Sequence, residues 1–126
     1  MQEIWKDIKG YEGLYQISNL GNVKSIRYFN HANNKAYTRN RLLKTSKTEK
    51  GYLRVELYKK GKGKKIRVHR LVAETFLPNL YNFKEINHKD GNKQNNCVDN
   101  LEWCTHSYNM REACKLGLVI PPKHIT

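Results

Sequence analysis

The sequence EINHKDGNKQNNCVDNLEWCTHSYN, residues 85–109, places one histidine and many asparagines between two short apolar runs. Residues 85–86 lead into the turn signal KDGN at 89–92, and the alternation of apolar and polar residues resumes at 101–103. Asp-Gly between two such runs is typical of a connection between antiparallel strands. The stretch therefore predicts a strand, a long polar loop and a second strand.

A helix is expected after the second strand. Thr105 is a suitable N-cap, residues 108–116 contain neither glycine nor proline, and Gly117 followed by Pro121 and Pro122 supplies a stop signal. So small a strand, strand and helix unit buries little apolar surface. Hydrogen bonds among the loop asparagines, a metal ion, or both must therefore fix the polar loop.

The spacing of His88, Asn100 and Asn109, with NHKDGN and NNCVDNLEW along the way, resembles the HNH (His-Me finger, ββα-metal) endonucleases. The resemblance implies that His88 activates water, that Asn100 braces the loop and orients the histidine, and that Asn109 binds a divalent metal. An imidazole titrates near neutral pH and suits a general base. An amide oxygen suits a hard cation such as Mg²⁺ or Mn²⁺, which should bind tightly only with DNA present.

One position departs from the family pattern. The phage and intron-encoded homing endonucleases that the chain resembles often carry a metal-binding aspartate before the histidine, and this chain has Asn87. Asn87 can still bind metal through its amide oxygen, but less strongly because it lacks charge. Asn87→Asp is therefore expected to lower the metal concentration needed for cleavage. Loop-structuring roles are expected for Asp90, Asn92, Asn95 and Asn96.

Length and charge limit the class of protein. The chain has 126 residues, enough for one domain or one domain with a small appendage. Lys and Arg number 24 against 11 Asp and Glu, a net charge of +13, which predicts a nucleic acid as partner. The resemblance implies that this nucleic acid is double-stranded DNA. No apolar run could span a membrane, and MQEIWKDIKG has no signal-peptide pattern, so a cytoplasmic location is expected, in the host cell if a phage encodes the protein.

The cysteines are Cys97, Cys104 and Cys114, an odd number without a C-x-x-C pair. This argues against a disulfide framework and against a zinc ribbon. A structural zinc would have to share His88, so we expect plain thiols.

Residues 3–23, EIWKDIKGYEGLYQISNLGNV, alternate aromatic and β-branched residues with glycines, which predicts short antiparallel strands and a hairpin turn at Asn22. Trp5, Tyr11, Tyr15 and Ile17 are the expected small core. The stretch also resembles the nuclease-associated module that precedes the HNH motif in homing endonucleases.

Residues 27–44, RYFNHANNKAYTRNRLLK, are basic, polar and interleaved with aromatic residues. They predict a surface loop or mobile ribbon, either solvated or in contact with DNA. The resemblance favours DNA contacts by Arg27, Arg39, Arg41 and Lys44.

Apolar residues between 52 and 68 flank KKGKGKK, which predicts a hairpin with a flexible tip at 59–65. Lys62, Lys64 and Lys65 of this tip are expected to contact phosphates.

A change to helical periodicity at 69–77, HRLVAETFL, predicts a helix that Pro78 ends. His69 is expected to be structural or to face phosphate. Arg70 is either a DNA contact or a surface salt bridge.

The sequence thus predicts an α+β protein: an antiparallel β DNA-binding module at 1–66 followed by an HNH ββα-metal nuclease domain at 67–126. The resemblance implies a metal-dependent DNA endonuclease with one Mg²⁺ or Mn²⁺ per active site, nicking one strand per active site. A monomer or weak dimer is expected, and a double-strand break would require dimerisation or two binding events. The alternatives are a DNA-binding module with weak or lost cleavage and a basic RNA-binding protein. Homing endonucleases continue into a helix-turn-helix or similar DNA-recognition module where this sequence ends. Recognition of the DNA sequence is therefore expected from the N-terminal ribbons or from a phage or host protein partner, or cleavage is expected to be only loosely specific.

Overall fold

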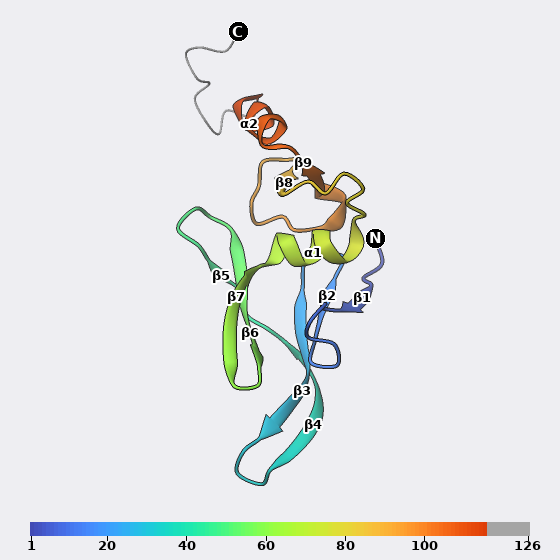
Figure 1. Cartoon of the computed structure of the whole chain (residues 1–126), viewed down its shortest axis with the longest axis vertical. Coiled ribbons are helices and arrows are strands. Elements are labelled where there is room, and N and C mark those ends of the chain that lie inside the picture. Colours follow the sequence, from blue (N-terminus) through green and yellow to red (C-terminus); the bar gives the residue numbers. More distant parts are fainter. Residues whose placement is uncertain (116–126) are drawn as a thin grey trace.

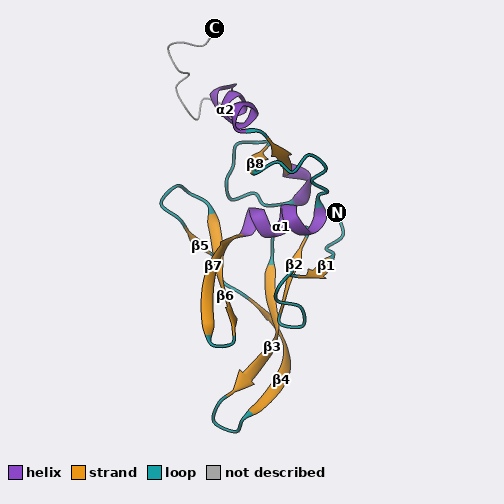
Figure 2. Ribbon diagram, viewed as in Figure 1, coloured by secondary structure: helices purple, strands orange, loops and turns teal. Residues whose placement is uncertain are grey.

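The computed structural model describes residues 1–115, which form an elongated α+β protein (Figure 1). Gly117, Pro121 and Pro122, the predicted stop signal of the last helix, lie outside the described residues. The β sheets of the N-terminal half lie on one side of helix α1 (Val68–Phe76), and a small hairpin with helix α2 (His106–Lys115) lies on the other (Figure 2).

The first sheet contains four antiparallel strands in chain order: β1 (Trp5–Asp7), β2 (Tyr15–Ser18), β3 (Val23–Asn30) and β4 (Lys35–Leu42). The turn before Val23 lies where the sequence predicts it. The β3–β4 ribbon extends away from α1 to one end of the molecule (Figure 1).

Of the two alternatives for residues 27–44, a surface loop or a ribbon, the structure shows the ribbon, because most of this segment lies in two paired strands. Tyr28 and Tyr37 are cross-strand partners whose rings stack at 5.4 Å between centroids. Such an aromatic pair stabilises a ribbon that has little hydrophobic core of its own.

The second sheet contains β5 (Ser46–Lys47), β6 (Leu53–Lys59) and β7 (Lys62–Arg67). Lys60 and Gly61 both have positive φ, 53° and 78°, as a two-residue hairpin turn with mirror-image geometry requires. The predicted hairpin is confirmed, but its turn consists only of residues 60–61, so the predicted tip at 59–65 was too long.

Strand β7 includes all three lysines that were predicted on that tip. Lys64 pairs with the buried Leu57, whereas Lys65 pairs with the exposed Glu56. Since successive side chains of a strand point to opposite faces, Lys62 and Lys64 share one face and Lys65 occupies the other.

Helix α1 confirms the predicted helix, although Val68, expected in the hairpin, is its first residue. Leu77 ends it with extended backbone, φ −111° and ψ 120°, because a residue before proline is driven out of the helical region. Val68 and Val72 are buried in one continuous hydrophobic core with residues of β2, β6, β8 and β9.

The last unit confirms the predicted strand, loop, strand and helix: β8 (Glu85–His88), a short 3-10 helix (Val98–Asn100), β9 (Leu101–Cys104) and α2. Thr105 Oγ1 accepts a hydrogen bond from the backbone N–H of Tyr108 at 3.2 Å, so the predicted N-cap is confirmed. No helix within residues 1–115 is long and apolar enough to cross a membrane.

Candidate active site

His88 closes strand β8 and is only 6% exposed. Its Nε2 lies 2.9 Å from Oδ1 of Asn96. An amide oxygen only accepts hydrogen bonds, so Nε2 carries the proton and Nδ1 keeps the lone pair. Burial lowers the pKa of His88 below its usual 6.5, an effect that the bond to Asn96 partly offsets. The imidazole is therefore neutral at physiological pH, with one basic nitrogen.

Asn96 is a site residue that the sequence analysis missed, since it was expected to stabilise a turn. It is buried, and the β2–β3 turn packs against it: a Cβ at Gly21, where φ is +89°, would lie 2.9 Å from that of Asn96. The backbone N–H of Val98 also donates to the carbonyl of Asn19 at 2.8 Å. The N-terminal sheet thus holds the hydrogen-bond partner of His88 in place.

Two further rings cover His88. The His69 ring lies 5.1 Å from it and stacks on Tyr52 at 5.0 Å, while Tyr52 lies 6.0 Å from His88. His69 is buried, and its Nδ1 is the only fully buried side-chain nitrogen or oxygen of the described residues without a hydrogen bond. Its burial argues against contact with phosphate, so the structural alternative is favoured.

His69 should make the protein sensitive to acid. Burial, and secondly the neighbouring His88, lowers the pKa of His69 to about 3, from 6.5 in the unfolded chain. Between these values only the unfolded state binds the proton, so the free energy of unfolding should be highest above pH 6.5. It should fall by up to about 1.4 kcal/mol per pH unit towards pH 3.

Urea unfolding at pH 7 and pH 4.5 measures this dependence. His69→Phe keeps a ring in the stack and removes the titration, so it should reduce the difference between the two pH values. His31→Gln, a change at an exposed histidine, should not. An equal pH dependence in wild type and His69→Phe would contradict the assignment.

Asn100 cross-links both ends of the polar loop. Its Nδ2 donates to Oδ1 of Asp90 and to the carbonyl of Asn95, each at 2.9 Å, and its Oδ1 accepts from the backbone N–H of Asp90 at 3.0 Å. Asp90 also accepts from Nδ2 of Asn95 and the backbone of Asn92, and these bonds lower its pKa. Asp90, Asn92 and Asn95 therefore structure the loop as predicted. Asn100 is hydrogen-bonded to Asp90, two residues after His88, so it positions the histidine through the backbone.

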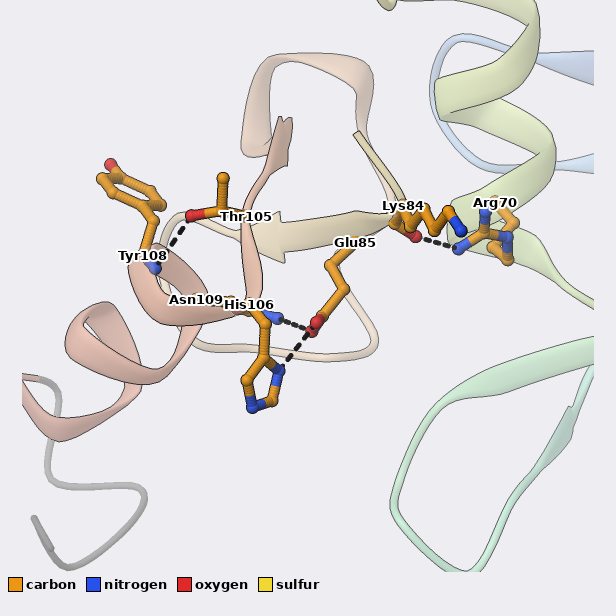
Figure 3. Close-up of polar contacts among 7 residues, drawn as sticks. All are labelled: Arg70, Lys84, Glu85, Thr105, His106, Tyr108 and Asn109. Atoms are coloured by element: carbon orange, nitrogen blue, oxygen red, sulfur yellow. Dashed lines mark hydrogen bonds and ion pairs between the residues drawn. The ribbon is translucent and has the colours of Figure 1, made fainter. Parts of the chain in front are cut away.

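The two predicted metal ligands are amides held by carboxylates. Asn109 Nδ2, on α2, donates to Oε1 of Glu85 at 3.2 Å (Figure 3). Asn87, 6% exposed, donates through Nδ2 to Oε1 of Glu102 at 2.9 Å. Each of these bonds uses the NH₂ group of the amide and not its Oδ1, the atom that can bind a metal. Two hard oxygen donors fit Mg²⁺ or Mn²⁺ better than zinc, and no group of three or more His, Cys, Asp or Glu within residues 1–115 is arranged to hold a metal.

The comparisons with known proteins agree with this geometry. Residues 67–111 match the family model described as HNH endonuclease, and residues 3–58 match the NUMOD4 motif. The DNA endonuclease I-HmuI of Bacillus phage SP01 is 43% identical over 113 residues, which cover 90% of this chain and 59% of that protein. Residues 67–111 belong to the HNH endonuclease family, and a NUMOD4 motif precedes them.

One further relative and one solved structure support the assignment. The uncharacterized HNH endonuclease L245 of Acanthamoeba polyphaga mimivirus is 40% identical over 114 residues, 90% of this chain and 31% of that protein. A solved structure described as DNA binding and cleavage by the HNH homing endonuclease I-HmuI matches with a TM-score of 0.75 and 41% identity, over 94% of this chain and 62% of that one. The chain thus spans less than two thirds of each of these HNH relatives.

The predicted DNA contacts of this HNH protein fall into separate places. Arg27, Arg39 and Arg41 lie on the β3–β4 ribbon, and Lys44 follows it. Arg39 is partly engaged within the ribbon: its Nε donates to Ser25 Oγ at 2.8 Å, and its guanidinium lies 4.9 Å from the Tyr28 ring centre.

Arg70 is engaged within the protein. It donates to the carbonyl of Lys84 at 3.1 Å (Figure 3), lies 3.6 Å from Glu74 and packs 5.7 Å from the centre of the Trp103 ring. These contacts tie α1 to the start of β8. They favour the structural alternative that was left open for Arg70.

The sequence analysis also missed a mainly basic groove beside the HNH motif. It is lined by Lys47, Thr48, Glu49, Lys50, Arg54, Lys65 and Arg67, five basic residues against one acidic residue. The Arg67 guanidinium lies 4.5 Å from the centre of the Tyr52 ring, and the Lys93 ammonium lies 4.9 Å from it. Tyr52 is in turn the ring next to His69 and His88. The groove therefore borders the wall of the candidate active site.

Proposed function

We propose that the protein is a metal-dependent DNA endonuclease that hydrolyses phosphodiester bonds and cuts one strand per active site. The observation that carries this proposal is the state of His88, a buried neutral imidazole whose Nε2–H is held by Asn96, leaving Nδ1 to accept a proton. Two amide oxygens for a metal lie on the same ββα unit. That I-HmuI is described as a DNA endonuclease supports DNA as the substrate.

In this mechanism Nδ1 of His88 takes the proton from the attacking water, a role that typically contributes about 10²–10⁴-fold to the rate. Asn109 and Asn87 would hold Mg²⁺ or Mn²⁺, with phosphate oxygens and water as the remaining ligands. The cation, when bound, neutralises charge that develops on the phosphate and leaving oxygen. Asn100 and Asp90 keep the loop in the conformation that positions His88.

We assign DNA binding to residues 1–66 and cleavage to residues 67–126. The two parts share one hydrophobic core, so they are two functional regions of one folded unit. DNA binding by the first region is supported by the basic groove and the β3–β4 ribbon.

Incubation of the purified protein with supercoiled plasmid tests the proposal. Conversion to the nicked circle in Mg²⁺ or Mn²⁺, and not in EDTA, is the expected result. Plasmid binding without nicking would instead favour a DNA-binding module that has lost cleavage. Stronger, metal-independent binding to RNA would favour an RNA-binding protein.

The salt dependence of DNA binding should distinguish the two faces of the β6–β7 hairpin. For each phosphate that the protein no longer neutralises, the plot of log affinity against log salt should flatten by about 0.9. Lys65→Gln with Arg67→Gln removes two charges from the groove and should flatten it by up to about 1.8. Lys62→Gln with Lys64→Gln removes two charges from the opposite face and serves as the matched control.

Fluorescence anisotropy over a range of salt concentrations measures both slopes. Equal flattening by the two pairs would mean that DNA contacts both faces of the hairpin. An unchanged slope of log affinity against log salt for Lys65→Gln with Arg67→Gln would exclude the groove as a DNA-binding surface.

A further inference from the structure

Each amide that is assigned to the metal has its NH₂ group bound by one glutamate. Glu85 begins β8 and accepts from Nδ2 of Asn109, and Glu102 on β9 accepts from Nδ2 of Asn87. The two pairs lie on the same face of the β8–β9 hairpin, the face towards α2, because strand side chains alternate and Asn87 pairs with Glu102 across the hairpin. The arrangement therefore occurs twice in one small unit.

We infer that Glu85 and Glu102 are positioning residues that turn the oxygens of Asn109 and Asn87 towards a divalent cation. An asparagine amide can rotate so that either its oxygen or its nitrogen faces a given direction, and only the oxygen binds metal. A carboxylate accepts hydrogen bonds but does not donate them, so it fixes the NH₂ on its own side. The inference rests on the proposed function, because it takes these amides as the metal ligands.

Both carboxylates are themselves fixed by the first turns of α2. Oε2 of Glu85 lies 2.7 Å from Nδ1 of His106, so this carboxylate bridges His106 and Asn109 (Figure 3). The Tyr108 phenol makes a side-chain hydrogen bond to Glu102, so it lies against the second carboxylate. Each glutamate thus binds one amide and one further α2 side chain, so it cannot swing away from its amide without also releasing the second side chain.

The two glutamates also supply charge. The amide ligands are neutral, and a site that binds a divalent cation through neutral oxygens alone is weak. Two carboxylates one hydrogen bond away from the ligand amides place negative charge beside the cation without occupying its coordination positions. Outer partners of this kind typically change metal affinity by about 10–100-fold when they are removed.

This arrangement alters the expected effect of Asn87→Asp. The sequence alone predicts tighter metal binding, but in the structure the new carboxylate would stand at the position of an amide nitrogen 2.9 Å from Oε1 of Glu102. Two carboxylates at that separation repel each other. Asn87→Asp combined with Glu102→Gln exchanges the two groups, so that the new Gln NH₂ faces the new Asp carboxylate and the hydrogen bond is re-formed in reverse.

The test measures Mn²⁺ affinity, by electron paramagnetic resonance of free Mn²⁺, for the full chain bound to a DNA duplex. All proteins carry His88→Ala so that the duplex stays intact. Glu102→Ala and Glu85→Ala should each weaken Mn²⁺ binding by about 10–100-fold, and Glu102→Gln by less, because its amide oxygen still accepts from Asn87. Glu56→Gln removes one negative charge from the exposed face of β6 and is the control.

The combined variant gives a measurement that would not change if Glu102 were only structural, namely the Mn²⁺ affinity. Asn87→Asp alone should lower the melting temperature of the metal-free protein and fail to tighten Mn²⁺ binding. Addition of Glu102→Gln should restore the melting temperature and bring Mn²⁺ affinity to at least that of the parent. In nuclear magnetic resonance spectra of the metal-free protein, the side-chain NH₂ signals of Asn87 should shift in Glu102→Ala and those of Asn109 in Glu85→Ala.

Mn²⁺ affinity within twofold of the parent in both alanine variants would overturn the inference, as would a parent complex that binds no Mn²⁺. Failure of the proposed function is separable. If the wild-type chain does not nick plasmid but the glutamate variants lose Mn²⁺ as expected, the metal site stands and only the catalytic assignment falls.

Discussion

His88→Ala should abolish nicking of supercoiled plasmid while leaving DNA affinity nearly unchanged. Loss of a general base typically costs about 10²–10⁴-fold in rate. The side chain is 6% exposed and enclosed by Asn96, His69 and Tyr52, so it offers almost no surface to a DNA strand. Plasmid nicking in Mg²⁺ gives the rate, and anisotropy with a labelled duplex gives the affinity.

Asn82→Gly is a suitable control for this experiment, because Asn82 is exposed and its φ of 54° is one that glycine adopts without strain. It should nick at the wild-type rate. A His88→Ala protein that folds, binds DNA and still nicks at that rate would falsify the assignment of His88 as the base.

Asn109→Ala should cause a loss of similar size, but by a different route. It removes one of only two protein oxygens that are assigned to the cation, so the midpoint for Mg²⁺ or Mn²⁺ should rise, with nicking partly restored at high metal concentration. His88→Ala cannot be restored in this way, because it leaves the metal ligands in place. The measurement is the nicking rate as a function of metal concentration for both variants.

The fold of Asn109→Ala should be little affected, since Asn109 is half-buried and its side chain donates a single hydrogen bond, to Glu85, within residues 1–115. A rate that stays low at every metal concentration, as for His88→Ala, would show that Asn109 acts on something other than the cation. A rate and a midpoint equal to those of wild type would remove Asn109 from the site.

Several features of the fold follow from signals that act over a few residues. Thr105 caps α2 because its hydroxyl lies within reach of the N–H of Tyr108, three positions along. Pro78 ends α1 through steric contact with the preceding residue. The Lys-Asp-Gly-Asn turn separates β8 from the long loop for equally local reasons, so the strand, loop, strand and helix order was predictable.

The errors lie where the sequence pattern is ambiguous. Residues 59–65 are all lysine or glycine, so no apolar alternation marks where β6 ends and β7 begins. Only the positive φ of Lys60 and Gly61 locates the turn. The same ambiguity left both a loop and a ribbon open for residues 27–44, which are mostly polar, because the cross-strand pair of Tyr28 with Tyr37 forms only when the two strands are paired.

The sequence by itself determined the order of elements in the nuclease motif and the candidates His88, Asn87, Asn100 and Asn109, because the residue types and spacing carry that information. The tertiary structure alone decided which side chains meet these candidates. Among the loop asparagines only Asn96 reaches His88, and the glutamates that hold Asn109 and Asn87 come from strands β8 and β9.

The physical reason is that a side-chain hydrogen bond needs donor and acceptor within about 3 Å, and this is set by how the chain folds back on itself. The loop contains three chemically identical side chains close together in the sequence: Asn92, Asn95 and Asn96. Asn92 and Asn95 form hydrogen bonds within the loop. Asn96 instead packs against the β2–β3 turn and contacts His88. That selection depends on contacts between residues distant in the chain, which no local pattern encodes.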